Sequence, residues 1–140
     1  MVLAGAHGVV PIRLKTKSVS SPIEDTDGLR ILATRFRGRG LSTDRYDVWM
    51  PSLGPSEQLL RQVLSGKLAW PKFLKLYRQE LFTDGQIDAK NATIKNHGQK
   101  FTLRLIKRLA ESQNVTLLCH CAEEATQCHR YELLKVISKT

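Results

Sequence analysis

The stretch from Val115 to Arg130 constrains the fold of this chain more than any other part of its sequence. Val115–Cys119 is apolar at nearly every position, as expected for a strand that is covered on both faces of a sheet. A helical pattern begins after Cys128-His129-Arg130, so a buried strand leads through a short polar loop into a helix. In an α/β sheet, ligands usually bind between the carboxyl end of a strand and the next helix. A ligand site is therefore expected in this stretch.

Apolar periodicity predicts further strands and helices around this unit. Residues 9–14 and 29–36 have the composition of strands, and the polar, turn-rich residues 16–28 between them indicate a loop. Trp49 and Met50 are predicted to anchor the core. Apolar residues three and four positions apart predict helices over residues 56–64, 70–81, 101–109 and 131–137.

Strands that alternate with helices predict an α/β fold, namely a single three-layer domain with a central, mostly parallel sheet flanked by helices. A length of 140 residues suits one domain with a real core, so residues 1–140 are assigned to it. The N-terminal residues are small and apolar but lack a basic segment in front of them, which argues against a secretory signal. Residues 1–8 are instead expected to form a flexible N-terminus.

The net charge is +9, from 22 basic and 13 acidic residues, and this excess favours an anionic partner. No apolar run is long enough to span a bilayer, so no membrane partner is expected and the predicted location is the cytoplasm. Three cysteines form an odd set, which argues against a disulfide framework and favours thiols, metal ligands or reactive groups in a reducing compartment. No cofactor is predicted, and the sequence leaves the oligomeric state open.

The opening stretch contains the side chains of a tetrahedral zinc site. Thiolate sulfur and imidazole nitrogen are the ligands that structural zinc prefers, and three cysteines with one histidine give the required number. The spacing is unusual, because paired C-x-x-C knuckles are missing and the last two ligands are adjacent in sequence. Zinc therefore stays an alternative, with the ligands Cys119, Cys121, Cys128 and His129.

A thiol nucleophile is the second interpretation of these residues. A cysteine near a helix N-terminus and arginines has a lowered pKa and therefore more thiolate. Cys119 is the first candidate nucleophile, with a buried, inert thiol as the alternative, and His120 or His129 is available as an acid or base. The C-x5-R phosphate loop of tyrosine phosphatases and rhodaneses is absent, because Glu124 stands six positions before Arg130.

Non-covalent anion binding is the third interpretation. N–H groups at the start of the last helix, together with Cys128 and Arg130, face the carboxyl ends of the strands. Arg35 lies near the end of the predicted strand 29–36, and Arg37 and Arg39 belong to the basic, glycine-containing turn that follows it. If that strand lies beside Val115–Cys119, the arginines reach the same edge of the sheet. A phosphate or nucleotide would then be held by two segments that are distant in sequence.

Three motifs occur along the chain: a strand with a basic turn, Leu29–Gly40; an Asp47-x-Trp49 pair before Leu53-Gly54-Pro55-Ser56; and, as the most specific part, Leu117-Leu118-Cys119…Cys128-His129-Arg130. Together they resemble the YeaO-like proteins, domain-of-unknown-function family 488 (DUF488). Gly38-Arg39-Gly40 stands where the family has Pro-Arg-Gly, and Gly54 stands where it has Ala.

This resemblance covers most of the chain from about Val9 onward. It implies a compact α/β fold and a shared site, but no reaction, because the family is functionally uncharacterised. The site residues that it implies are Arg35, Arg39, Cys119, Cys128, His129 and Arg130.

The sequence thus favours a cytoplasmic α/β protein that binds a small anionic, phosphate- or nucleotide-like ligand in a Cys/His/Arg pocket, with thiol-based catalysis as an option. The alternatives are structural zinc and a basic nucleic-acid-binding module, although no recognition helix or stacking platform accompanies the charge. The predicted catalytic residues are Cys119, His120 and His129, and the predicted ligand-binding residues are Arg35, Arg39, Cys128 and Arg130.

Overall fold

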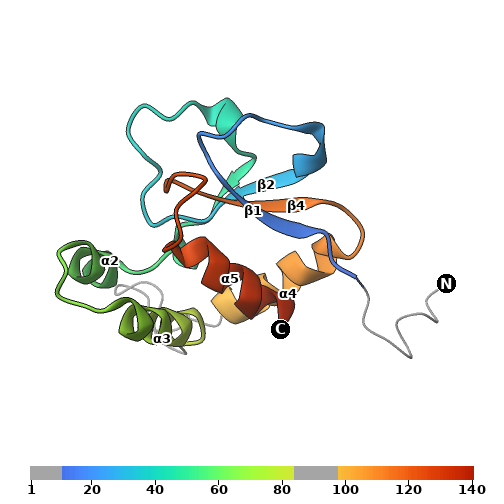
Figure 1. Cartoon of the computed structure of the whole chain (residues 1–140). Helices are drawn as coiled ribbons and strands as arrows, with labels where there is room; N and C mark the ends of the chain where they lie inside the picture. Colours follow the sequence, from blue (N-terminus) through green and yellow to red (C-terminus); the bar gives the residue numbers. More distant parts are fainter. Residues whose placement is uncertain (1–10, 84–97) are drawn as a thin grey trace, which may run out of the picture.

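The computed structural model describes residues 11–83 and 98–140, and the predicted flexible segment 1–8 lies outside them. Within this part of the chain, four parallel strands form one sheet in the order β1-β4-β2-β3 (Figure 1). The predicted α/β class and parallel sheet are thereby confirmed. The strands are β1 (Leu14–Ser18), β2 (Leu29–Leu32), β3 (Val48–Trp49) and β4 (Val115–Cys119).

Strand β4 lies between β1 and β2 and pairs with both. All five of its residues are buried, as predicted for a strand that is covered on both faces. Leu118 lies opposite Leu32 of β2, and Cys119 lies opposite Ser18 of β1. Because parallel strands end at the same edge, the segments that follow β1, β2 and β4 meet beside Cys119.

The described α-helices match the four predicted helical segments. Ser56 caps the first helix by accepting a hydrogen bond from the N–H of Leu59. In the second helix, Phe73, Tyr77 and Leu81 recur every four residues and are buried, which gives it an apolar face. None of the helices described has the length and apolarity that crossing a membrane requires. The helices are α2 (Glu57–Leu64), α3 (Trp70–Leu81), α4 (Gly98–Ala110) and α5 (His129–Ser138).

The two faces of the sheet are covered differently (Figure 1). The described α-helices lie on one side, where they form the main core with Ile31 and Leu117. On the other side, Leu32 and Leu118 form a smaller core against which Tyr46 packs. Loops cover that side, together with the short 3₁₀ helices η1 (Asp25–Asp27) and η2 (Thr43–Arg45), while η3 (Pro51–Leu53) leads from β3 toward α2.

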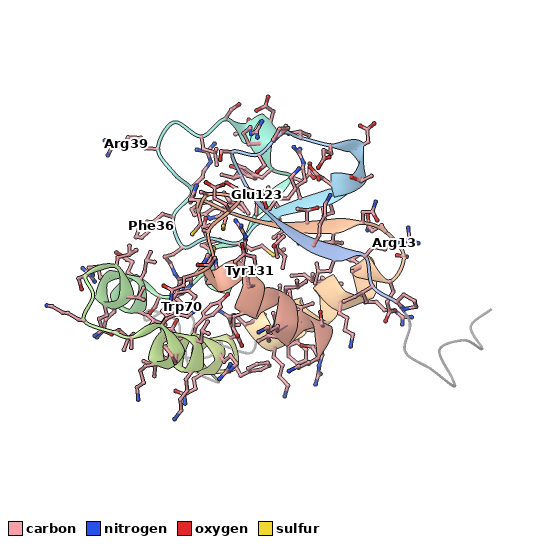
Figure 2. All side chains as sticks on the ribbon, viewed as in Figure 1. Arg13, Phe36, Arg39, Trp70, Glu123 and Tyr131 are labelled. Carbon is pink, nitrogen blue, oxygen red and sulfur yellow. The ribbon has the colours of Figure 1, made fainter. Side chains whose placement is uncertain are left out.

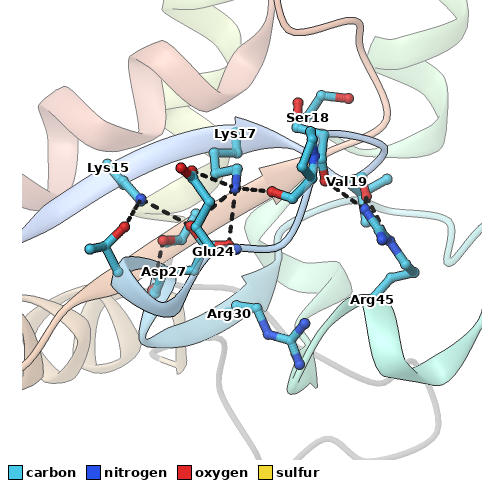
Figure 3. Close-up of polar contacts among 12 residues, drawn as sticks. Lys15, Lys17, Ser18, Val19, Glu24, Asp27, Arg30 and Arg45 are labelled. Atoms are coloured by element: carbon cyan, nitrogen blue, oxygen red, sulfur yellow. Dashed lines mark hydrogen bonds and ion pairs between the residues drawn. The ribbon is translucent and has the colours of Figure 1, made fainter.

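Strand β1 corrects the predicted position of the first strand. The sequence predicted a strand at residues 9–14 and a loop at 16–28, whereas β1 spans Leu14–Ser18, and residues 9 and 10 lie outside the described part. Ion pairs explain the difference, because Lys15 and Lys17 contact the buried carboxylate of Asp27 at 2.9 and 3.0 Å (Figure 3). These partners lie ten or more residues away, so local periodicity does not reveal them.

Trp49 corrects a second prediction. It was expected in the core, but it lies on the edge strand β3 with 38% of its surface exposed. Its indole N–H donates to the carbonyl of Thr34 at 2.8 Å, so the ring holds the segment after β2 instead of filling the core. Met50, the other predicted anchor, does pack against the main core.

Candidate functional site

A loop of residues 120–128 connects the carboxyl end of β4 to the start of α5. Cys119 ends the strand and Cys128 is the N-cap residue of the helix, and both are buried, whereas Cys121 is partly exposed. The three sulfur atoms lie within 4.8 Å of one another, and Cys128 Sγ is 3.1 Å from Cys119 Sγ. These three residues are called the thiol cluster below.

Arg130, in the first turn of α5, is completely buried against the thiol cluster. Its Nη1 donates to Cys119 Sγ at 2.9 Å, and its Nη2 donates to the backbone oxygen of Glu123 at 2.9 Å and to the Tyr131 hydroxyl at 2.8 Å. Its Nε is buried and has no hydrogen-bond partner among the described residues. Burial opposes the charge, but attraction to Cys119 and the hydrogen bonds outweigh it and raise the pKa of Arg130. The guanidinium is therefore a permanent positive charge.

Hydrogen bonds from two other segments hold the loop in place. The Glu123 carboxylate accepts from the hydroxyl of Ser21 at 2.5 Å and from the backbone N–H of Ser18 at 3.0 Å, and these bonds lower the pKa of Glu123. The Tyr131 hydroxyl donates to the carbonyl of Ala125 at 2.6 Å. Figure 2 shows Tyr131 at the first turn of α5 and Glu123 in the loop above it. The loop is thus fastened to both β1 and α5.

The two predicted catalytic histidines donate to the segment that follows β2. His129 Nε2 is 2.6 Å from the carbonyl oxygen of Ala33, and His120 Nε2 is 3.1 Å from that of Phe36. Because a carbonyl only accepts, each neutral ring carries its proton on Nε2 and has a bare Nδ1. Burial lowers the pKa of His129, so this ring is neutral near pH 7. Its Nδ1 lies 4.0 Å from Cys128 Sγ.

The thiols titrate as a unit because hydrogen bonds connect them. Bonds from Cys119 and Cys128 lower the pKa of Cys121 to about 2. The bond with Cys121 raises the pKa of Cys119 more than the bond with Cys128 lowers it, and bonds with both partners raise the pKa of Cys128. The direct contact of Arg130 with Cys119, by contrast, favours charge on Cys119. Both features place one thiolate in the cluster at neutral pH. Cys121 is the member of the cluster that solvent reaches.

Arg35 and Arg39 form no hydrogen bond with the thiol cluster in the part of the chain that the structure describes. Arg35 donates to the carbonyls of Gly54 and Pro55, both at 3.1 Å, and so ties the segment after β2 to the start of α2. Arg39 is exposed on the loop after β2, and Figure 2 shows it directed away from the body of the molecule. Strands β2 and β4 are neighbours as expected, but these two side chains do not converge on Cys119. Their ligand-binding role stays a prediction.

The predicted zinc ligands also lie close together. Zn–S bonds of about 2.3 Å place tetrahedral sulfur ligands roughly 3.8 Å apart, so the thiol cluster needs small shifts to hold a metal. His129 is directed suitably, because a metal-bound histidine typically gives its other N–H to a carbonyl, as His129 does to Ala33. The three cysteines and His129 could therefore hold zinc, which stays a hypothesis.

Tyr131 is a site residue that the sequence analysis placed only in the predicted C-terminal helix. Its hydroxyl bridges Arg130 and the loop carbonyl of Ala125. The sequence could have indicated this role, because Tyr131 directly follows Cys-His-Arg, in the first helical turn beside the loop. The sequence also allows a purely structural role for this cluster, in which Arg130 pairs with Glu123 or Glu124 to brace the loop. The structure places the Arg130 and Glu123 side chains 3.8 Å apart.

The chain is similar to one described protein family. The family described as "Active DUF488-N3 subclade" (DUF488-N3a) matches residues 14–140, a range that begins with β1 and includes the whole thiol cluster. No curated protein and no solved structure matches the chain. The resemblance to DUF488 proteins is thereby confirmed, and the chain belongs to the DUF488 family.

Proposed function

We propose that the thiol cluster is the centre of an enzyme that attacks a small anionic electrophile through a cysteine thiolate. Cys121 is the nucleophile, because it is partly exposed whereas Cys119 and Cys128 are buried. This assignment differs from the sequence-based preference for Cys119, whose sulfur is buried. The observation that carries the proposal is the contact of a fully buried Arg130 with the cluster.

The burial of Arg130 calls for a negative charge beside it, because an unpaired buried charge costs several kcal/mol. The Glu123 carboxylate is 3.8 Å away, and its side chain is 51% exposed. Cys119 Sγ, by contrast, accepts from Arg130 at 2.9 Å. A thiolate on Cys121, whose sulfur lies within 4.8 Å of Cys119 Sγ, supplies the compensating negative charge through the cluster. Thiolate is also the nucleophilic form of cysteine.

Several features favour a negatively charged ligand. The chain carries a net charge of +9, which draws anions to its surface. Arg130 Nε is a buried donor without a partner in the described part of the chain. Phosphate- and nucleotide-like compounds remain the first ligand classes to screen. The description of the family as an active subclade accords with catalysis, and a reducing cytoplasm would keep the cysteines as thiols.

Alkylation kinetics test this proposal. Reduced protein is treated with iodoacetamide over a range of pH, and mass spectrometry of peptides identifies the cysteine that reacts first. We expect Cys121 to react first, with a pH midpoint well below the ordinary value of about 8.5. The ratio of the iodoacetate rate to the iodoacetamide rate should be higher for the protein than for free cysteine. Iodoacetate is anionic and iodoacetamide is neutral, and the site favours anions.

Matched variants sharpen the test. Cys121→Ser should abolish the rapid reaction, and Arg130→Lys should raise the midpoint because the contact with Cys119 is weakened. Arg13→Lys is the control, because Arg13 is exposed at the amino end of β1, far from the loop (Figure 2). An ordinary pH midpoint for Cys121 in the folded wild type would overturn the proposal.

Nucleic-acid binding is a second candidate function, favoured by a groove of about 480 Å³ between α3, α4 and α5. Its lining includes Phe82, which is 47% exposed. Cations contact phosphates and an exposed ring stacks with bases in single-stranded nucleic-acid sites. This function makes no use of the thiols, so Cys121→Ser should leave it intact. The basic residues of the groove are Arg78, Lys100, Arg104 and Lys139.

Zinc binding is the competing function for the thiol cluster itself. It is favoured by the bare Nδ1 of His129, which lies 4.0 Å from Cys128 Sγ. Elemental analysis of protein purified without chelators decides between the two. If the wild-type protein contains stoichiometric zinc and Cys121→Ser does not, the thiol cluster is a metal centre and not a free nucleophile.

A further inference from the structure

The thiol cluster contains more sulfur than nucleophilic attack needs. One thiolate is enough to form a covalent intermediate, and Cys121 is placed to do so. Behind it, Cys119 and Cys128 are buried with their sulfur atoms 3.1 Å apart. A disulfide bond is about 2.05 Å long, so these two atoms need to approach by roughly 1 Å to form one. The geometry therefore provides a two-electron donor next to the nucleophile.

The surroundings of the cluster restrict the leaving group. His120 and His129 each direct their Nε2 at a backbone carbonyl, of Phe36 and Ala33 respectively, so this ring proton is already engaged and is not directed at a leaving group. Arg130 does not deprotonate, and the Glu123 carboxylate already accepts hydrogen bonds from the Ser18 N–H and the Ser21 hydroxyl. A group that departs as a stable anion is therefore favoured. A thiolate, with a conjugate-acid pKa of about 8.5, leaves far more readily than hydroxide, at about 15.7.

We propose that the thiol cluster reduces anionic low-molecular-weight disulfides, with Cys121 as the attacking thiol and a Cys119–Cys128 disulfide as the oxidised product. This inference rests on the proposed function, because it requires Cys121 to be the nucleophile. It adds the substrate class and the fate of the electrons.

The first step is attack of the Cys121 thiolate on one sulfur of a disulfide R–S–S–R. A Cys121–S–R bond forms, the substrate S–S bond breaks, and RS⁻ leaves with the electron pair. Cys119 gives its proton to this RS⁻, and its own thiolate is then stabilised by Arg130 at 2.9 Å. The first thiol product, RSH, is released.

The next two steps transfer the disulfide from Cys121 to the buried pair, Cys119 and Cys128. The Cys119 thiolate attacks Cys121 Sγ, forms a Cys119–Cys121 bond and expels the second RS⁻. Cys128 gives its proton to that RS⁻ and attacks Cys119 Sγ, from which it is only 3.1 Å away. The Cys119–Cys121 bond breaks, and Cys121 is again a thiolate. In total, one disulfide becomes two RSH, and Cys119 and Cys128 lose two electrons and two protons. An external dithiol restores them.

The test is a single turnover of reduced, oxygen-free wild-type protein with oxidised glutathione, which is anionic. Acid quenching, alkylation and peptide mass spectrometry then identify the products. We expect two equivalents of glutathione to be released, a Cys119–Cys128 disulfide, and a Cys121 that can still be alkylated. Cystamine, a cationic disulfide, should react about tenfold more slowly after normalisation to free cysteine. Hydrogen peroxide should also react more slowly than oxidised glutathione.

Variants trap each stage of the sequence. Cys119→Ser should stop after one equivalent with glutathione bound to Cys121, and Cys119→Ala is the second version if the serine variant folds poorly. Cys128→Ser should release two equivalents and accumulate the Cys119–Cys121 disulfide. Cys121→Ser should release no glutathione on this timescale.

The failures of the two proposals are distinguishable. If Cys121 shows rapid alkylation at low pH but wild-type protein stops at one equivalent, or reacts faster with peroxide, the disulfide-reductase assignment is overturned and the nucleophile stands. If Cys121 alkylates with an ordinary midpoint, both proposals fall.

Discussion

Arg130 links the charge of the thiol cluster to the shape of the loop. One nitrogen of its planar fork donates to Cys119 Sγ, and the other reaches the backbone of the loop and the hydroxyl of Tyr131. A guanidinium makes these contacts at once because its donors point in fixed directions. The loop that carries Cys121 is therefore shaped by the same group that stabilises the thiolate.

Arg130→Lys should destabilise the protein by about 2–4 kcal/mol at neutral pH. Lysine keeps the charge but lacks the fork, so several buried acceptors lose their donors. Denaturant unfolding monitored by circular dichroism measures the change. Arg13→Lys, an exchange of the same kind at an exposed position, should stay within about 0.5 kcal/mol of wild type. Equal stability of the two variants would show that the buried fork contributes little.

At the scale of elements, the position of β1 depends on the carboxylate of Asp27, which is ten or more residues away from the strand's two lysines in sequence. Asp27 is 2% exposed and lies between Lys15 and Lys17 of the strand (Figure 3). Burial tends to raise the pKa of Asp27, but hydrogen bonds from the Glu24 backbone and the two lysines lower it from 3.8 to about 2. The folded state therefore holds Asp27 ionised more strongly than the unfolded state does.

Asp27→Asn should remove part of the acid sensitivity of folding. Because the pKa of Asp27 is depressed in the fold, its contribution of about 2 kcal/mol is present above pH 3.8 and is lost as pH falls through about 2. The stability gap between wild type and Asp27→Asn should therefore narrow across that window. Urea unfolding at a series of acidic pH values measures it. Asp47→Asn is the control, since Asp47 pairs with Arg30 at a more exposed position and should show a smaller gap. A constant gap would contradict the assignment.

The elements that the sequence predicted correctly are those with a local signal. The nearly continuous apolar run of β4 and the four-residue spacing of Phe73, Tyr77 and Leu81 each lie within one segment. Strand β1 was misplaced because Lys17 is buried through a partner ten residues away. The thiols were predicted to gather because they share one loop. The directions of the Arg35 and Arg39 side chains were not predictable from the order of the strands. Arg35 turns to the carbonyls of Gly54 and Pro55, and Arg39 turns to solvent.

At the scale of the whole molecule, the thiol cluster and the cationic groove lie at opposite ends of α5. Cys128 caps the start of this helix, whereas Val136 and Lys139 near its end line the groove. The ten residues of α5 (Figure 1) rise about 15 Å from one end of the helix to the other, so the two regions are separate. The groove therefore tests the nucleic-acid alternative independently of the thiols.

If the groove binds single-stranded nucleic acid, affinity for an oligonucleotide should fall steeply with salt. Each phosphate contact contributes about 0.7 to the slope of log K against log salt, so Lys100→Gln, Arg104→Gln and Lys139→Gln together should reduce the slope by about 2. The control triple Arg13→Gln, Arg61→Gln and Lys67→Gln removes the same charge at exposed positions outside the groove. Fluorescence anisotropy at several salt concentrations measures both. An equal reduction of this slope in the two triple variants would show that binding depends on the net charge of +9 and not on the groove. No binding at low salt would leave the thiol cluster as the functional site that the fold supports.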